Sequence, residues 1–488
     1  MAGDISRDTF DPAKHFSRVL MQQGRVLLDA DWNEQTAIHL HYLRTLAADL
    51  IGPAAGPRDD CGFRIEAPNR FVGDDETDTR DGEFPRRTRG EEILKDEDGG
   101  GPRPRPRPPV EAPRNFLIGA GRYYVEGILC ENDFPVFYTR PEKGHAPVQP
   151  DWPADELENG LTYLVYLVAW ERDVNALEDE SIREVALGAH GPDTATRAKV
   201  VWQVKAEEWD ASLDGISAIE LPRREQWRKQ LEKWRPANRG RLKAKADEAD
   251  DPNAATPCII SPDARYRGAE NQLYRVEIHR GGMVADGATF KWSRENASVN
   301  LPVRTVSGNQ VTLEYLGRDA RLGLQIGDLV ELADEDYSSG NRAEPLLRIT
   351  DIDPAEMIVT LSDTPASVFT GTDERPIILR RWDGAGSIKE VAGGSANWVE
   401  LEDGVKIQFQ PGGSYRTGDF WRIPARTATG DVEWPGPVGQ PEARPPHGIE
   451  HHYAPLARIR VEDAEVTVET DLRLIFAPLA VEPAVEPR

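Results

Sequence analysis

The second half of the chain repeats one pattern, in which short runs of alternating apolar and polar residues are separated by turn residues. Examples are Leu273–His279 and Ala288–Val299, and Asp403-Gly404 within Trp398–Phe409 predicts a hairpin turn. Runs about 10 to 15 residues apart are typical of β-sandwiches and small barrels. With 42 glycines and 38 prolines in 488 residues, many turns and few long helices are expected. The sequence therefore predicts a multi-domain, mainly β chain, α+β overall, built from small sandwich or barrel modules.

The first 52 residues predict an extended arm followed by one helix. Asp31 and Glu34 have the spacing of a capping box at the start of a helix, and apolar residues follow at helical spacing. Gly52-Pro53 then stops the helix. We expect this helix and its arm to form an element separate from the β modules.

Two other segments stand out from the strand pattern. Trp227, Leu231 and Trp234 lie at helical spacing in a charged background, which predicts a short surface helix. Residues 74–114 combine acidic runs with PRPRPRPP, a composition that cannot bury a core and predicts a disordered loop. The expected layout is an arm and docking helix (1–52), a first β-rich domain (53–215) carrying that loop, a charged helical insertion or linker (216–256), a β module (257–315), a small barrel (316–380) and a C-terminal β domain (381–488).

The charge balance argues against two classes of partner, nucleic acids and acidic membranes. The chain has 59 Lys and Arg against 84 Asp and Glu, a net charge of −25 that repels nucleic-acid backbones and acidic membrane surfaces. Its longest apolar run, Leu161–Trp170, is too short for the roughly 20 residues that span a bilayer. We expect no nucleic-acid binding, no membrane insertion and a cytoplasmic location, with lysis as a route of later release.

The candidate metal ligands are few. His447, His451 and His452 form the one histidine cluster among 9 histidines, and a metal site there competes with a structural corner between prolines in which the rings bond backbone groups. Asp29, with the two acids of the capping box, could hold a hard cation, although charges at a helix N-terminus explain these residues better. No nucleophile or phosphate-loop motif is present, so no catalytic or cofactor-binding residue is assigned and neither enzyme activity nor a cofactor is expected.

Long strings, more specific than any short motif, carry a resemblance to a known group. In order along the chain they are SRDTFDPAKHFSRVLMQQGRVLLDADWNEQ (6–35), AWERDVNALEDESIREVALGAHGPDTATRAKVVWQVK (169–205), NQLYRVEIHRGG with ATFKWSRENASV, and YRTGDFWRIPARTATGDVEWP followed by PPHGIEHHYAPLA. Together they resemble an uncharacterised bacterial family whose genes tend to lie among those of phage-tail-like contractile injection systems. The resemblance implies a structural component of such a particle, at the baseplate or in a fibre or shell attached to it. Its implied partners are other tail or baseplate subunits, with several copies of the chain in each cytoplasmically assembled particle.

In this setting we expect the arm and its helix to dock on a neighbouring subunit, because aromatic and aliphatic side chains dominate interface energies. Alternatively, the same residues close the core of their own first domain. The candidate anchors are Phe10, Phe16, Leu20, Val26 and Trp32.

Two other functions remain open at this point. A receptor- or glycan-binding module of the same particle could use tryptophans as stacking platforms, although core packing explains them equally well. A metal-dependent hydrolase built on the histidine cluster, or a delivered effector, is the third alternative. The tryptophans concerned are Trp382, Trp398, Trp421 and Trp434.

Overall fold

The computed structural model describes most of the chain and is mainly β, as predicted. Of the loop expected at 74–114, only Arg114 lies within the described residues. The short 3-10 helices are η1 (Pro12–Lys14), η3 (Glu180–Ile182), η4 (Val185–Leu187), η5 (Ala211–Leu213), η6 (Leu221–Arg223) and η7 (Val284–Asp286). The described ranges are 3–68, 114–140, 147–149, 156–187, 193–247, 265–317, 322–334, 343–367, 376–389, 398–437 and 439–478.

Three sheets enclose the first hydrophobic core, which we call the base module. They share buried residues such as Phe63, Val165, Trp202 and Leu456. Their strands, in spatial order, are β24 (Glu465–Asp471), β23 (His452–Glu462), β7 (Thr162–Val174) and β8 (Arg197–Glu208); then β25 (Ile475–Phe476), β1 (Ala54–Pro57), β4 (Gly121–Val125) and β5 (Ile128–Asn132); and β2 (Ile65–Glu66), β3 (Leu117–Ile118) and β6 (Val136–Phe137).

The predicted short helix is confirmed as α2 (Glu225–Trp234). It covers the outer face of the long β23-β7-β8 sheet, where Trp227 is buried and the Trp234 ring stacks 4.0 Å from the Tyr166 ring. The amphipathic spacing seen in the sequence therefore serves packing against the sheet.

Two further sheets pack face to face as a sandwich. Side chains from both meet in one core, among them Ala244, Val276, Ile407 and Trp421. The expected hairpin turn is present, because Asp403 and Gly404 have φ of 47° and 82°, a pair of values that glycine makes possible. The strands are β18 (Gly384–Ser387), β11 (Thr289–Ser293), β10 (Gln272–Arg280), β21 (Phe420–Arg426) and β22 (Asp431–Val432), opposed by β19 (Val399–Glu400), β20 (Val405–Phe409) and β9 (Leu242–Ala246).

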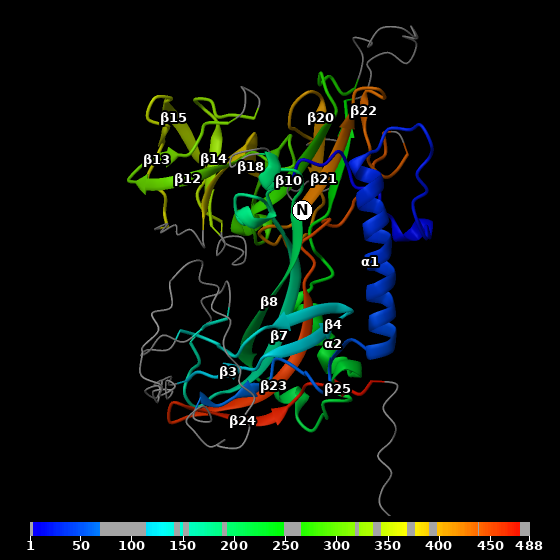
Figure 1. Ribbon diagram of the computed structural model, residues 1–488, viewed down its shortest axis with the longest axis vertical. Coiled ribbons are helices and arrows are strands. Elements are labelled where there is room, and N and C mark those ends of the chain that lie inside the picture. Colours follow the sequence, from blue (N-terminus) through cyan, green and yellow to red (C-terminus); the bar gives the residue numbers. More distant parts are fainter. Residues whose placement is uncertain are drawn as a thin grey trace, which may run out of the picture.

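A closed barrel stands beside the sandwich (Figure 1). Its interior is filled by aliphatic side chains, including Val311, Leu332, Val359 and Leu379. Closure removes the sheet edges that would otherwise pair with other chains. Its strands, in order around the barrel, are β12 (Asn300–Ser307), β13 (Gln310–Leu313), β16 (Ile358–Leu361), β15 (Leu347–Asp353), β14 (Leu329–Ala333) and β17 (Ile377–Trp382).

Strands pair across the segment boundaries expected from the sequence. β12 and β13, expected in the module 257–315, belong to the barrel, while β9 comes from the expected insertion and pairs with β20. β23, expected in a C-terminal domain, pairs with β7 in the base module. Apolar alternation marks a strand but does not name its partner, because the partner is set by how the chain returns in space.

The other α-helix, α1 (Asp29–Ile51), runs alongside the sandwich and the base module (Figure 1). The expected end is confirmed at Gly52, but the helix begins at Asp29, two residues before the predicted capping box. Its N-cap is Leu28, which has no capping side chain, so the predicted start was wrong. Asp31 and Glu34 lie in the early turns, where negative charge favours the helix dipole.

Candidate functional site

Most of the large apolar side chains of helix α1 lie on the outside. Only Ala30 and Ile38 of its residues are buried. Trp32 is 77% exposed and Leu50 is 68% exposed, at opposite ends of the helix. An amphipathic surface helix normally shows the reverse arrangement, with its apolar face on the core.

The arm before α1 is also rich in exposed apolar side chains. Phe16, Leu20 and Val26 are 54%, 69% and 80% exposed. The alternative interpretation required these candidate anchors and Trp32 to close the core of the first domain. Their exposure shows that they do not pack into the core of the base module. Phe10 differs from the others, because its half-buried ring lies 5.8 Å from the ring of His41 on α1. Docking on another subunit stays a prediction.

The start of the arm is fixed to the protein's own sandwich. The Arg422 guanidinium donates to Asp8 at 2.6 Å, and the Asn296 amide donates to the backbone oxygen of Gly3 at 2.9 Å. A third contact joins Arg7 to Glu433. The exposed part of the arm is therefore held between this anchored start and α1.

Hydroxyl groups of the arm satisfy the acids at the N-terminus of α1. Asp29 accepts hydrogen bonds from the backbone N–H and the hydroxyl of Ser6 at 2.8 and 2.7 Å. Burial raises the pKa of Asp29, but these hydrogen bonds outweigh burial and hold the pKa below its usual value. The Thr9 hydroxyl donates to Glu34 at 2.5 Å. These contacts attach the arm to the first turns of the helix.

The far end of α1 is tied to the base module. Arg44 makes two hydrogen bonds to the Glu171 carboxylate of β7, at 2.6 and 3.1 Å. The backbone of Gly127 also lies so close to the Arg44 carbonyl that a Cβ there would clash at 2.2 Å. α1 is therefore fastened at both ends, and its outer face is presented in a defined orientation.

The three candidate histidines have separate neighbours. His447 Nδ1 accepts the backbone N–H of Arg422 at 3.0 Å, whereas the buried His451 ring lies 5.1 Å from that of Trp170. His452 Nδ1 lies 2.6 Å from a carboxylate oxygen of Glu126. In the described ranges no three His, Cys, Asp or Glu side chains are grouped to hold a metal. The His447 contact fits the structural-corner interpretation.

The tryptophans considered as glycan platforms divide into two groups. Trp382 and Trp421 are buried in the cores, at 1% and 0% exposure, so their rings cannot stack on a sugar. Trp398 and Trp434 are half-buried, with Lys245 Nζ 4.9 Å from the Trp398 ring centre and the Trp434 indole bonded to the Glu442 carbonyl.

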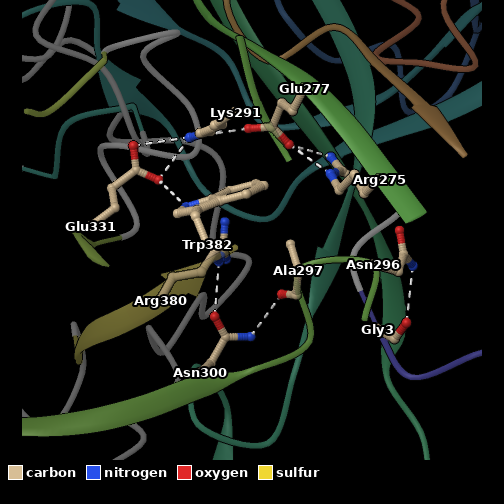
Figure 2. Close-up of polar contacts among 10 residues, drawn as sticks. All are labelled: Gly3, Arg275, Glu277, Lys291, Asn296, Ala297, Asn300, Glu331, Arg380 and Trp382. Atoms are coloured by element: carbon tan, nitrogen blue, oxygen red, sulfur yellow. Dashed lines mark hydrogen bonds and ion pairs between the residues drawn. The ribbon is translucent and has the colours of Figure 1, made fainter. Parts of the chain in front are cut away.

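A buried ion network joins the sandwich to the barrel (Figure 2). Lys291 of β11 and Glu331 of β14 are each 1% exposed, and the Lys291 ammonium lies 2.9 and 2.7 Å from the two carboxylate oxygens. The Trp382 indole donates to Glu331 at 3.1 Å, and its ring centre lies 4.4 Å from Lys291 Nζ. Glu277 lies 3.3 Å from the same ammonium.

The network extends through Glu277 to a guanidinium on the same strand, since Arg275 Nε donates to the Glu277 carboxylate at 2.6 Å. Burial raises the pKa of Glu277, but Arg275 and Lys291 outweigh burial and hold it at about 2. These buried charges pair with one another, so each has an oppositely charged partner at the junction between the two modules.

This network was not predicted from the sequence. In the alternating run around Lys291, Phe290 and Trp292 face the sandwich core, which would leave Lys291 on a solvent face. The barrel covers that face instead. The one available signal was a lysine between two large aromatic residues in a strand.

The loop that leads into the barrel also holds the arm. Asn296 and Ala297 have φ of 50° and 57°, and Asn296 makes the contact to Gly3 described above (Figure 2). Asn300 then accepts a hydrogen bond from Arg380 Nε of β17 at 2.8 Å. The start of the arm therefore sits near the junction between sandwich and barrel.

A family model, described as a family of unknown function, matches residues 1–81, 110–226 and 219–480. The chain belongs to this family, DUF6519. The part matched by DUF6519 includes the arm, α1 and all three β modules. No match to the chain was found among curated proteins or solved structures. In the described part of this DUF6519 chain, neither helix is long and apolar enough to cross a membrane.

Proposed function

We propose that this DUF6519 chain is a non-catalytic structural subunit of a larger assembly, attached through its arm and α1. The observation that carries the proposal is the row of exposed apolar side chains from Phe16 to Leu50 on an element fastened at both ends. Large exposed apolar surfaces mark interaction sites, because covering them removes apolar area from water.

The architecture supports a structural role. Each of the three β modules has its own filled core, and the described sandwich–barrel contact includes a fully buried ion network. A subunit of this kind holds a fixed geometry while it presents a docking element. The Glu277 carboxylate, whose pKa is held at about 2, is paired with the cations Arg275 and Lys291 of the same network.

The assembly we propose is a phage-tail-like contractile injection system, with the chain in the baseplate region or in a fibre or shell attached to it. The support is the resemblance of residues 6–35 and of the later collinear strings to the family found among such genes. Several copies per particle and neighbouring tail subunits as partners follow from this proposal. Docking through the arm would place each copy at an equivalent position of a symmetric particle.

The test is to sediment large particles from the native host and quantify this chain by mass spectrometry against sheath and tube proteins. A fixed ratio that survives washing is the expected result. A trace amount lost on washing would contradict a structural role and favour an effector or a free enzyme. Metal analysis of the purified chain would then become the next measurement.

A further inference from the structure

The outward face of α1 has a regular spacing that goes beyond general apolarity. Its six positions follow one another at intervals of four, three, four, three and four residues, and all six side chains are exposed. This is the a and d spacing of a heptad repeat, which forms one stripe along a helix. We call this stripe the α1 seam; it consists of Trp32, Thr36, His39, Leu43, Leu46 and Leu50.

A seam with this spacing fits another helix. Residues repeating every 3.5 positions present a straight row of knobs, and the matching holes are formed by four residues of a facing helix. The other α-helix in the described ranges, α2, is already committed, because Trp227 and Trp234 pack on the β7 sheet. From Trp32 to Leu50 the seam is about 27 Å long at 1.5 Å per residue.

We infer that the α1 seam pairs with the seam of a second copy of this chain, giving a two-fold symmetric dimer. This inference rests on the proposed docking function of the arm and α1 and names the first partner of that surface. Every copy carries one seam, and a surface that matches itself closes under two-fold symmetry. Exposed Leu40 and Tyr42 lie beside the stripe and widen the contact.

Charge also favours a second copy. The six seam positions contain no Lys, Arg, Asp or Glu, and residues 10–51 contain four basic and five acidic residues in a chain of net charge −25. Two copies repel each other over most of their surface but meet almost neutral surface at α1. Added salt should therefore strengthen this dimer, because it screens the remaining repulsion. A basic partner would be held less tightly in salt.

The experiment is sedimentation of the full chain over a range of concentrations, in low and high salt. We expect a dimer, and we expect L43E with L46E to weaken it by about a hundredfold or more, because each charge would be buried in the seam. The matched control is T45E, at an exposed position between the two on another side of the helix. It adds the same kind of charge and should leave the dimer intact.

A neutral pair, L43N with L46N, should also dissociate the dimer, and circular dichroism should show all variants folded. A wild-type chain that stays monomeric at high concentration would overturn the inference, as would a dimer unaffected by both pairs of substitutions. If the wild type is monomeric but L43E with L46E is lost from particles, self-pairing fails while the docking function stands. If the dimer forms by the seam but no particle contains it, the proposed function fails and the inference holds.

Discussion

Lys291 and Glu331 lie in different modules, and neither side chain reaches solvent. Replacing Lys291 by Met would leave the Glu331 carboxylate without its cation, and removing one partner of a buried pair costs about 3–5 kcal/mol. We expect K291M to lower the stability of the sandwich and barrel by that amount, measured by denaturant unfolding. The base module should keep its own transition.

Two variants control this prediction. Lys389→Met alters an exposed lysine outside the network and should change stability by less than about 0.5 kcal/mol. Adding Glu331→Gln to K291M should recover part of the loss, because the orphaned charge is removed. Equal losses for K291M and K389M would contradict a role for the buried pair.

His451 makes stability depend on pH. Burial, followed by the nearby Arg416 and Lys205, lowers the pKa of His451 well below its usual value of about 6.5. The unfolded chain therefore binds a proton first, so this contribution is complete above pH 6.5 and is lost as the pH falls below it. We expect the free energy of unfolding of the base module to decrease from about pH 6.5 downward.

The slope attributable to His451 is up to about 1.4 kcal/mol per pH unit. His451→Gln cannot take up the proton, so unfolding curves between pH 6.5 and 5 should show a smaller slope than the wild type. The same slope in the variant would mean that another group titrates there.

For single residues, the sequence shows the chemistry of each side chain but not which residues surround it in the fold. The three histidines of PPHGIEHHY are close in sequence but contact different residues. Their neighbours, in chain order, are Arg422, Trp170 and Glu126. His452 is the first residue of β23, whereas His451 precedes the strand, and their rings meet different neighbours. The partner of each ring comes from a distant segment, and spacing along the chain does not encode it.

Among the elements, α1 carries the proposed docking surface. We expect Trp32→Ala to leave the melting temperature unchanged, because the side chain is exposed. The same change should lower incorporation into particles at least tenfold, since truncating a tryptophan buried in an interface typically costs about 2 kcal/mol or more. Incorporation is measured by mass spectrometry of washed particles.

Ile219→Ala is the matched control, because Ile219 is 69% exposed and lies outside the arm and α1. It should be incorporated like the wild type. If Trp32→Ala failed to fold, the alternative that Trp32 stabilises its own domain would be supported. Equal incorporation of both variants would show that Trp32 does not contribute to the interface.

Element positions were predictable where a period was strong. The alternating runs located β10 and β11, and helical spacing located both α-helices. β9 (LKAKA) was missed because it lies in a charged segment and carries small alanines on its inner face. Whether the arm's apolar residues were covered could not be read from the sequence, because cover depends on the rest of the fold.

For the whole molecule, the modules differ in whether they are built from one continuous segment of the chain. All six barrel strands lie between Asn300 and Trp382, whereas the base module needs β23 and β25 from far downstream. We expect a fragment of residues 298–384 to unfold cooperatively on its own, as seen by circular dichroism and chemical denaturation. A barrel fragment that remains unfolded would show that it needs the sandwich.

The corresponding fragment 53–215 contains β8 but lacks β23, which pairs with the other edge of β7, so it should not fold. Supplying residues 440–478 in trans is expected to restore its structure. Folding of 53–215 alone would mean that β23 is dispensable for the core.

This long return has a consequence for biosynthesis. After β8 leaves the ribosome, β7 keeps one unpaired edge until His452–Glu462 has been made, and at roughly 5–20 residues per second that wait lasts about 12–50 s. An exposed edge of a long apolar strand is a site for pairing with other nascent chains. The barrel is completed during that interval, so the part of the chain translated first is among the last to become native, and its yield in a cell should depend on chaperones that shield β7 while translation continues.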